Sequence, residues 1–100
     1  MNIEKKLHKI IPQIPSIRET EYETNPKAYL KFFNILGRGE WYVTELEVEE
    51  NDILMFGYVK SPLGADCDEF GYFTLNQIKE VPAIELDLYF EPCRIKEVMT

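Results

Sequence analysis

Cysteine and histidine are scarce in this sequence, which limits the chemistry that it can carry. The 100 residues include two cysteines, Cys67 and Cys93, and one histidine, His8. A structural zinc site needs four ligands, commonly cysteine and histidine, so these three residues do not complete one. Catalysis by a Cys-His pair requires a histidine beside a thiol, but His8 lies among lysines on a predicted helix surface. We expect two reduced thiols and no cofactor.

Long apolar runs and glycine-rich phosphate loops are absent as well. No segment approaches the roughly 20 apolar residues of a membrane-spanning helix, and the first residues contain no signal-peptide core. We therefore expect a cytoplasmic protein with no membrane partner. The segment Gly37-Arg38-Gly39 lacks the further glycine and the Lys-Ser/Thr pair of a phosphate loop, and it is typical of a hairpin turn.

Basic residues are fewer than acidic residues in this sequence. The chain has 11 Lys and Arg residues against 18 Asp and Glu residues, which gives a net charge of −7. A domain that binds nucleic acid directly needs a basic surface, so we expect no direct nucleic-acid binding. Another protein is the expected partner.

The residues that are present describe one domain of class α+β. The length and the 45% of hydrophobic residues suffice for a single core. We divide the domain, residues 1–100, into a helix with an irregular connection (1–26), a sheet core (27–92) and a tail or short helix (93–100). Ile3, Leu7, Ile10 and Ile11 recur at helical spacing before Pro12, which predicts an amphipathic helix packed on the sheet.

From residue 27 onward the apolar period changes to two, and β-branched and aromatic residues dominate short runs. The predicted strands cover residues 28–36, 41–48, 53–59, 70–75 and 85–90. Short turns join them, so we predict an antiparallel meander of four or five strands. Thr74 or Asn76 is placed to cap a short helix near residues 74–80, and residues 94–98 are predicted as a final short helix.

Acidic residues follow one face of the second predicted strand. Strict alternation places Glu45, Glu47 and Glu49 in a row with a spacing of about 6.6–6.8 Å, opposite an apolar face. The row is extended by Glu40, Glu50 and Asp52. It would attract the Lys/Arg cleft of a protein that binds a phosphate backbone, which predicts a nucleic-acid mimic. A solubilising face is the open alternative, and cross-strand Lys31 or Lys60 can neutralise part of the row.

A second acidic segment contains Asp66, Asp68 and Glu69, whose oxygen atoms suit Mg²⁺ or Ca²⁺. Their spacing does not match the twelve-residue calcium loop, which favours a solvated loop. Together with Glu45 or Asp87 they are candidate ligands of a metal-dependent nuclease or another phosphoryl-transfer enzyme. This enzyme is the alternative function.

Aromatic residues are frequent in the predicted strands. Stacking on single-stranded nucleic acid would need a basic groove as well, so core packing explains most of them. Any surplus that is exposed on the sheet would mark a protein-binding patch.

Several sequence strings occur in an order that is typical of one family. They are KFFN (31–34), WYVTEL (41–46), FG (56–57), EFGYFTL (69–75) and IELDLYF (84–90). Together they resemble domain-of-unknown-function family 2958 over roughly residues 3–95. The resemblance implies a small bacterial protein carried largely by plasmids, phages and other mobile elements, and it implies no activity.

The resemblance also implies that a set of polar residues on the matched strands is shared with the family. Its members are Thr44, Glu45, Glu69, Tyr72, Glu85 and Asp87. They suit a binding surface, and a packing role stays open. The chain departs from the family at Leu86, where many members have a basic residue, and in a shorter link between Leu75 and Ile84. We expect a non-catalytic accessory protein that binds another protein, in its sharper form an inhibitor of a host defence or DNA-processing enzyme.

Overall fold

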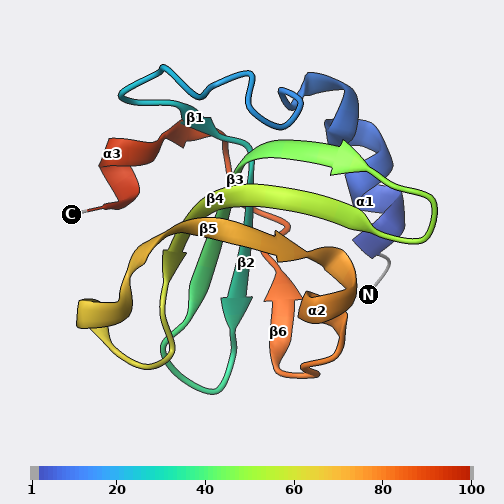
Figure 1. The fold of residues 1–100 in the computed structure, drawn as a ribbon. Helices are drawn as coiled ribbons and strands as arrows, with labels where there is room; N and C mark the ends of the chain where they lie inside the picture. Colours follow the sequence, from blue (N-terminus) through green and yellow to red (C-terminus); the bar gives the residue numbers. More distant parts are fainter. Residues whose placement is uncertain (1–2, 100) are drawn as a thin grey trace.

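A five-stranded antiparallel sheet dominates the computed structural model, which describes residues 3–99 (Figure 1). Its strands are β2 (Leu30–Asn34), β3 (Glu40–Val48), β4 (Ile53–Lys60), β5 (Glu69–Thr74) and β6 (Ile84–Leu86). The other elements are α1 (Ile3–Ile10), η1 (Ile11–Gln13), β1 (Lys27–Ala28), η2 (Ala65–Cys67), α2 (Leu75–Lys79), β7 (Cys93–Arg94) and α3 (Ile95–Val98). The α+β class is confirmed. The predicted domain ends, at residues 1–2 and 100, lie outside the described residues.

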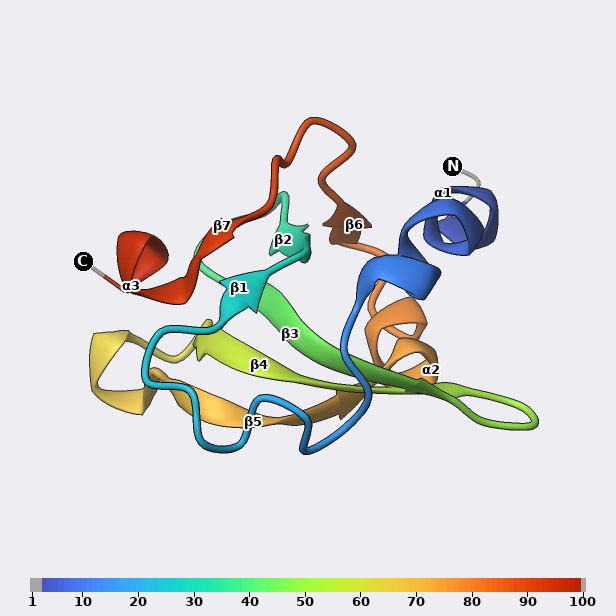
Figure 2. The ribbon, with the colours of Figure 1, turned by 90° about the horizontal axis from the view of Figure 1, so that it is seen from above.

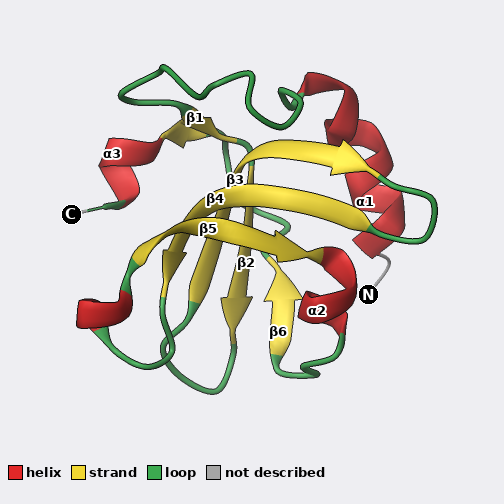
Figure 3. Cartoon of the chain, in the orientation of Figure 1, coloured by secondary structure: helices red, strands yellow, loops and turns green. Residues whose placement is uncertain are grey.

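The strand order, β5-β4-β3-β2-β6, is a meander from β2 to β5 with one exception. β6 does not pair with β5, its predecessor in the chain. It crosses through α2 to the opposite edge and pairs with β2 instead, with Phe32 opposite Leu86 (Figure 3). The prediction of an antiparallel sheet of four or five strands is therefore confirmed, with five strands, and the simple meander is wrong for the last strand.

The first predicted strand, residues 28–36, is interrupted in the structure. Lys27 and Ala28 form β1, which pairs with β7 in a separate two-stranded sheet, and β2 begins at Leu30. β2 ends at Asn34, so the hairpin loop covers residues 35–39 rather than 37–39. Gly39 has a φ of 140°, a conformation that suits glycine because other side chains rarely adopt it.

A β-bulge in β3 changes which residues share a face. Val43 pairs with Gly57 but Glu45 pairs with Phe56, so Thr44 is an extra residue on this strand. Strict alternation is therefore wrong for the second predicted strand. A Cβ atom on Gly57 would lie 1.6 Å from the Tyr42 carbonyl oxygen, which shows how closely the two strands approach beside the bulge.

The segment after β5 forms the short helix that was predicted near residues 74–80. The strand predicted after it is shorter than expected. α2 is capped by Thr74, whose hydroxyl accepts from the Gln77 backbone N–H while the Gln77 side chain accepts from the Thr74 N–H. This capping box satisfies two backbone donors at the helix start. The last predicted strand, residues 85–90, ends at Leu86 because a turn follows, and the final helix is confirmed as α3.

Apolar side chains form two clusters, one on each face of the sheet. Leu7 of α1, Leu75 and Ile78 belong to the larger cluster. Its sheet residues are Leu30, Phe32, Val43, Leu46, Met55, Phe73 and Leu86. Ala28, Tyr42, Tyr58 and Ile95 form the smaller cluster, beside β1, β7 and α3. Figure 2 shows α1 and α2 at one end of the molecule and α3 at the other.

Two findings concern membranes and thiols. No helix within residues 3–99 combines the length and apolar character needed to cross a membrane. Cys67 and Cys93 are free thiols, as the sequence predicts.

Candidate functional site

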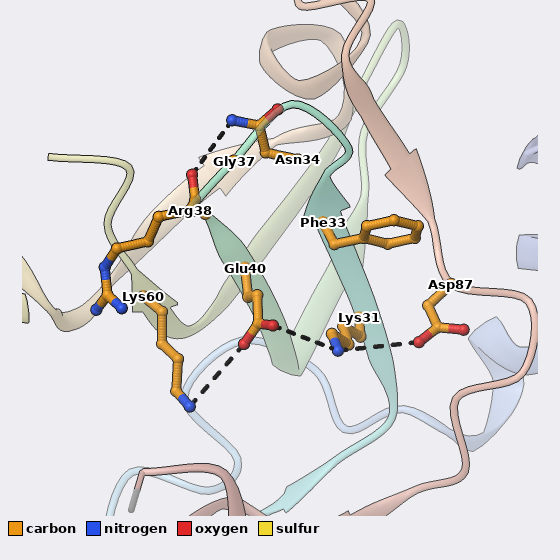
Figure 4. Close-up of a pocket in the computed structure, with 9 residues that line it drawn as sticks. Lys31, Phe33, Asn34, Gly37, Arg38, Glu40, Lys60 and Asp87 are labelled. Carbon is orange, nitrogen blue, oxygen red and sulfur yellow. Dashed lines mark hydrogen bonds and ion pairs between the residues drawn. The ribbon is translucent and has the colours of Figure 1, made fainter. Parts of the chain in front are cut away.

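A cavity of about 400 Å³ lies where β2, β3 and β4 meet the loop after β6 (Figure 4). Lys31 stands between two carboxylates, with its Nζ 3.5 Å from Glu40 Oε2 and 4.0 Å from Asp87 Oδ2. Lys60 approaches Glu40 from the other side, with 3.9 Å between Nζ and Oε1. We call this cavity the ion-paired pocket. The predicted neutralisation of acidic side chains by Lys31 and Lys60 is confirmed for Glu40.

Glu40 is the centre of this network. Its Oε1 accepts a hydrogen bond of 2.7 Å from the Tyr42 hydroxyl. Burial of the phenol and this hydrogen bond to a carboxylate raise the pKa of Tyr42. The phenol therefore stays a neutral donor that fixes the Glu40 carboxylate. The Lys31 ammonium also lies over the Tyr42 ring, 5.7 Å from its centre.

The hairpin loop beside the pocket is held by Arg38. Its Nε donates to the Ser61 carbonyl oxygen at 2.9 Å, and its guanidinium pairs with Asp68 Oδ2 at 2.5 Å. The hydrogen bond from Arg38 is the main cause of a lowered pKa at Asp68, whose other oxygen accepts from the Ser61 N–H. Arg38 and Asp68 thus tie the β2–β3 loop to the segment before β5.

The acidic segment of Asp66, Asp68 and Glu69 does not gather its carboxylates. Asp68 is turned toward Arg38, and Asp66 and Glu69 are exposed. Over the described part of the chain there is no group of three or more His, Cys, Asp or Glu side chains arranged to hold a metal ion. Glu45 and Asp87, the other candidate ligands, lie in two different cavities.

Glu45 is not on an exposed acidic row. Only 2% of this residue is accessible, because the segment before β1 packs over its side chain at Arg18 and Thr20. Its Oε1 accepts from the Arg18 N–H at 2.8 Å, and its Oε2 accepts from the Thr20 N–H at 3.0 Å and from the Thr20 hydroxyl. The predicted row is therefore wrong at its first member, whose carboxylate holds the 18–20 segment on the sheet.

The remaining acidic positions lie around the β3–β4 hairpin. Glu47, Glu49 and Glu50 are exposed. Asp52 is partly exposed and has a structural role, because its Oδ1 accepts from the N–H groups of Ile53 and Asn76. Desolvation alone would raise the pKa of Asp52, but the hydrogen bonds that it accepts lower it. Asp52 connects the hairpin to α2.

A second cavity of about 400 Å³ lies on the face that carries Glu45. Phe56, Phe70 and Tyr72 line it, with ring centres 4.8 Å apart for Phe56 and Tyr72 and 6.1 Å apart for Phe56 and Phe70. Phe70 is 39% and Tyr72 59% exposed. The opposite wall comes from the segment before β1 and includes Arg18, Thr20, Glu21, Glu23, Thr24 and Pro26. We call this cavity the aromatic groove.

Comparison with known families supports the resemblance seen in the sequence. A family model described as protein of unknown function (DUF2958) matches residues 3–96. The chain belongs to this family. No curated protein and no solved structure matches the chain.

The polar positions that the family resemblance singled out in the sequence divide between different places. Glu45 and Tyr72 line the aromatic groove, and Asp87 lines the ion-paired pocket. Thr44 is buried at the bulge, where its hydroxyl donates to the Phe56 carbonyl oxygen at 3.1 Å. The other two, Glu69 on β5 and Glu85 on β6, line neither cavity. These six positions therefore do not form one site.

Sequence reasoning missed both cavities of this DUF2958 protein. Lys31, Glu40 and Lys60 belong to three strands, and only the register brings them together: Glu40 lies opposite Phe33 on one side and Lys60 on the other. The aromatic surplus expected on the sheet is present at Phe70 and Tyr72, but the alternation alone did not identify which aromatics are exposed.

Proposed function

We propose that the protein is a non-catalytic binding module for another protein, and that the partner presents Lys or Arg side chains to the aromatic groove. The observation that carries this proposal is the exposed aromatic surface of Phe70 and Tyr72 beside exposed glutamates. An exposed aromatic patch rimmed by polar residues is typical of a protein-binding surface. Aromatic faces attract cations, and Tyr and Arg are frequent at the centres of interfaces.

The charges around the groove favour a basic partner. Glu21 and Glu23 are exposed on one wall. Glu47 is exposed as well, and its pairing with Leu54 places it on the sheet face of Glu45 and Phe56. Arg18 also lines the groove, and its guanidinium is paired with Glu21 at 3.6 Å. The acidic rim therefore complements a basic segment, in a chain whose net charge is −7.

Nucleic-acid mimicry is the specific form of this proposal. A protein that binds a phosphate backbone carries the Lys and Arg side chains that the groove would accept. Because Glu45 is committed to Arg18 and Thr20, the acidic contribution would come from Glu47, Glu49 and Glu50. Such a module would act in the cytoplasm as an accessory of a mobile element, as the family resemblance implies. We also infer that α1, through Leu7, serves as a lid on the larger core.

The experiment is a calorimetric titration of the full chain with a synthetic Lys/Arg-rich peptide of about ten residues. Loss of one aromatic contact to a cation is worth about 1 kcal/mol, so Tyr72→Ala should weaken binding about fivefold. Tyr89→Ala is the matched control, because Tyr89 is 92% exposed and does not line the groove. Equal affinities for both variants and the wild type would refute the proposal, as would equal binding of an acidic peptide.

A further inference from the structure

The ion-paired pocket gathers positively charged side chains within an acidic protein. Three of the 11 Lys and Arg residues line it, namely Lys31, Arg38 and Lys60. The two lysines are paired with Glu40 and Asp87, and Arg38 is paired with Asp68. With Asp68 included, the three cations and three carboxylates balance, whereas the chain as a whole has a net charge of −7. An anion is therefore repelled less at the pocket than over the rest of this acidic surface.

The two lysines of the pocket are held loosely by their partners. Their ion pairs measure 3.5, 3.9 and 4.0 Å, compared with about 2.7–2.9 Å for a direct charge-assisted hydrogen bond. An ammonium group has three donors, so each lysine can donate a hydrogen bond to a further acceptor atom. Both side chains are mostly covered by the protein, which strengthens their electrostatic attraction relative to lysines in open solvent.

Asp87 supplies an oriented acceptor at the other end of the pocket. Its Oδ1 accepts from the Tyr89 N–H at 2.9 Å, and its Oδ2 faces Lys31. In Figure 4 the Phe33 ring lies on the same side of the pocket as Asp87. A carboxylate in this position can accept hydrogen bonds from hydroxyl groups, and the ring adds an apolar wall. The volume of about 400 Å³ is within the range of small-molecule sites.

From this arrangement we infer that the ion-paired pocket binds a small phosphorylated ligand with hydroxyl groups, of the sugar-phosphate class. The phosphate bridges the ammonium groups of Lys31 and Lys60, and Asp87 accepts from a hydroxyl group of the sugar. Glu40 lies between the two lysines and competes with the phosphate for them. Neutralising Glu40 should therefore strengthen binding, an effect that loss of a purely structural ion pair would not produce.

The test is an NMR titration of the full chain with ribose 5-phosphate, inorganic phosphate and ribose, at constant ionic strength. We expect saturable shifts at the amides of Lys31, Gly39 and Lys60 with ribose 5-phosphate, weaker binding of phosphate and no binding of ribose. Shifts that sodium chloride reproduces would overturn the inference, because they would report only charge screening.

Four variants complete the test. Lys60→Gln should weaken ribose 5-phosphate binding about tenfold, and Lys96→Gln, outside the pocket, should leave it unchanged. Glu40→Gln should bind inorganic phosphate more tightly than the wild type. Asp87→Asn should weaken binding of ribose 5-phosphate and spare that of phosphate. The inference is overturned if Lys60→Gln and Lys96→Gln behave alike, or if Glu40→Gln binds phosphate more weakly while its spectrum shows an intact fold.

Discussion

The Glu45 carboxylate accepts a 3.0 Å hydrogen bond from the backbone N–H of Thr20, a residue 25 positions earlier in the chain. Two more hydrogen bonds, from the Arg18 N–H and the Thr20 hydroxyl, complete its surroundings. The segment that forms one wall of the aromatic groove is thus fixed by a side chain of β3. The groove depends on this relationship, because Arg18 and Thr20 line it together with Glu45.

Glu45→Gln should lower the free energy of unfolding by about 2 kcal/mol, because an amide has only one oxygen to accept these bonds and hydrogen bonds to a charged group are the stronger ones. Urea unfolding measures the change, and hydrogen exchange should show faster opening at Arg18 and Thr20. Glu47→Gln is the control, since Glu47 is exposed on the same strand and should change stability by less than about 0.5 kcal/mol. Equal stability of the two variants would contradict the assigned role of Glu45.

Gly57→Ala should destabilise the fold strongly, by about 3 kcal/mol or more, because the new Cβ atom would lie 1.6 Å from the Tyr42 carbonyl oxygen. The neighbouring strand offers a control: Gly71 pairs with Gly57, and a Cβ atom there meets nothing within 4 Å. Thermal unfolding of both variants measures the difference. A Gly57→Ala protein as stable as Gly71→Ala would show that the strands do not approach this closely at the bulge.

Stability should decrease in acid partly through Asp68. The hydrogen bond from Arg38 lowers the pKa of Asp68 in the folded state, so the ionised carboxylate stabilises the fold above the unfolded-state pKa of about 3.9. This contribution is lost as pH falls through the lower, folded-state pKa. We expect Asp68→Asn and Arg38→Gln each to flatten the dependence of the unfolding free energy on pH below about pH 4. A slope equal to that of the wild type in both variants would be inconsistent with the pair.

Thr74→Ala should cost about 1 kcal/mol of stability, because the N-cap hydroxyl that accepts from the Gln77 N–H is lost. Chemical unfolding measures the loss, and hydrogen exchange should localise it to α2. Thr24→Ala provides a comparison at an exposed threonine outside any helix, and it should be nearly neutral. If the two substitutions have the same effect, the capping box does not stabilise the helix.

Local signals in the sequence predicted much of the fold. Period-two runs located the strands, and Thr74, one of the two predicted cap residues, is the N-cap of α2; both signals depend on neighbouring residues. The pairing of β6 with β2 and of β1 with β7 depends on contacts distant in the sequence, so it was not predicted. The family resemblance identified the chain correctly over most of its length.

The sites were harder to predict for a related reason. One extra residue at Thr44 changes which residues before and after it share a face, but Glu45 stays on the face of Glu47. Glu45 is buried because the 18–20 segment, distant in the sequence, packs over it. The bulge leaves no simple mark in the sequence, although Gly57 on the facing strand is consistent with a close backbone approach. The lysines and carboxylates of the ion-paired pocket lie on separate elements, and only the strand register places them together.

The central claim is that the aromatic groove receives basic side chains, and an NMR map of peptide binding tests it most directly. We predict that a Lys/Arg-rich peptide shifts the amides of Phe56, Phe70 and Tyr72, and that the affinity falls at least severalfold between about 50 and 500 mM salt, because exposed charges are screened. Shifts spread evenly over the surface, or confined to residues outside the groove, would contradict the claim.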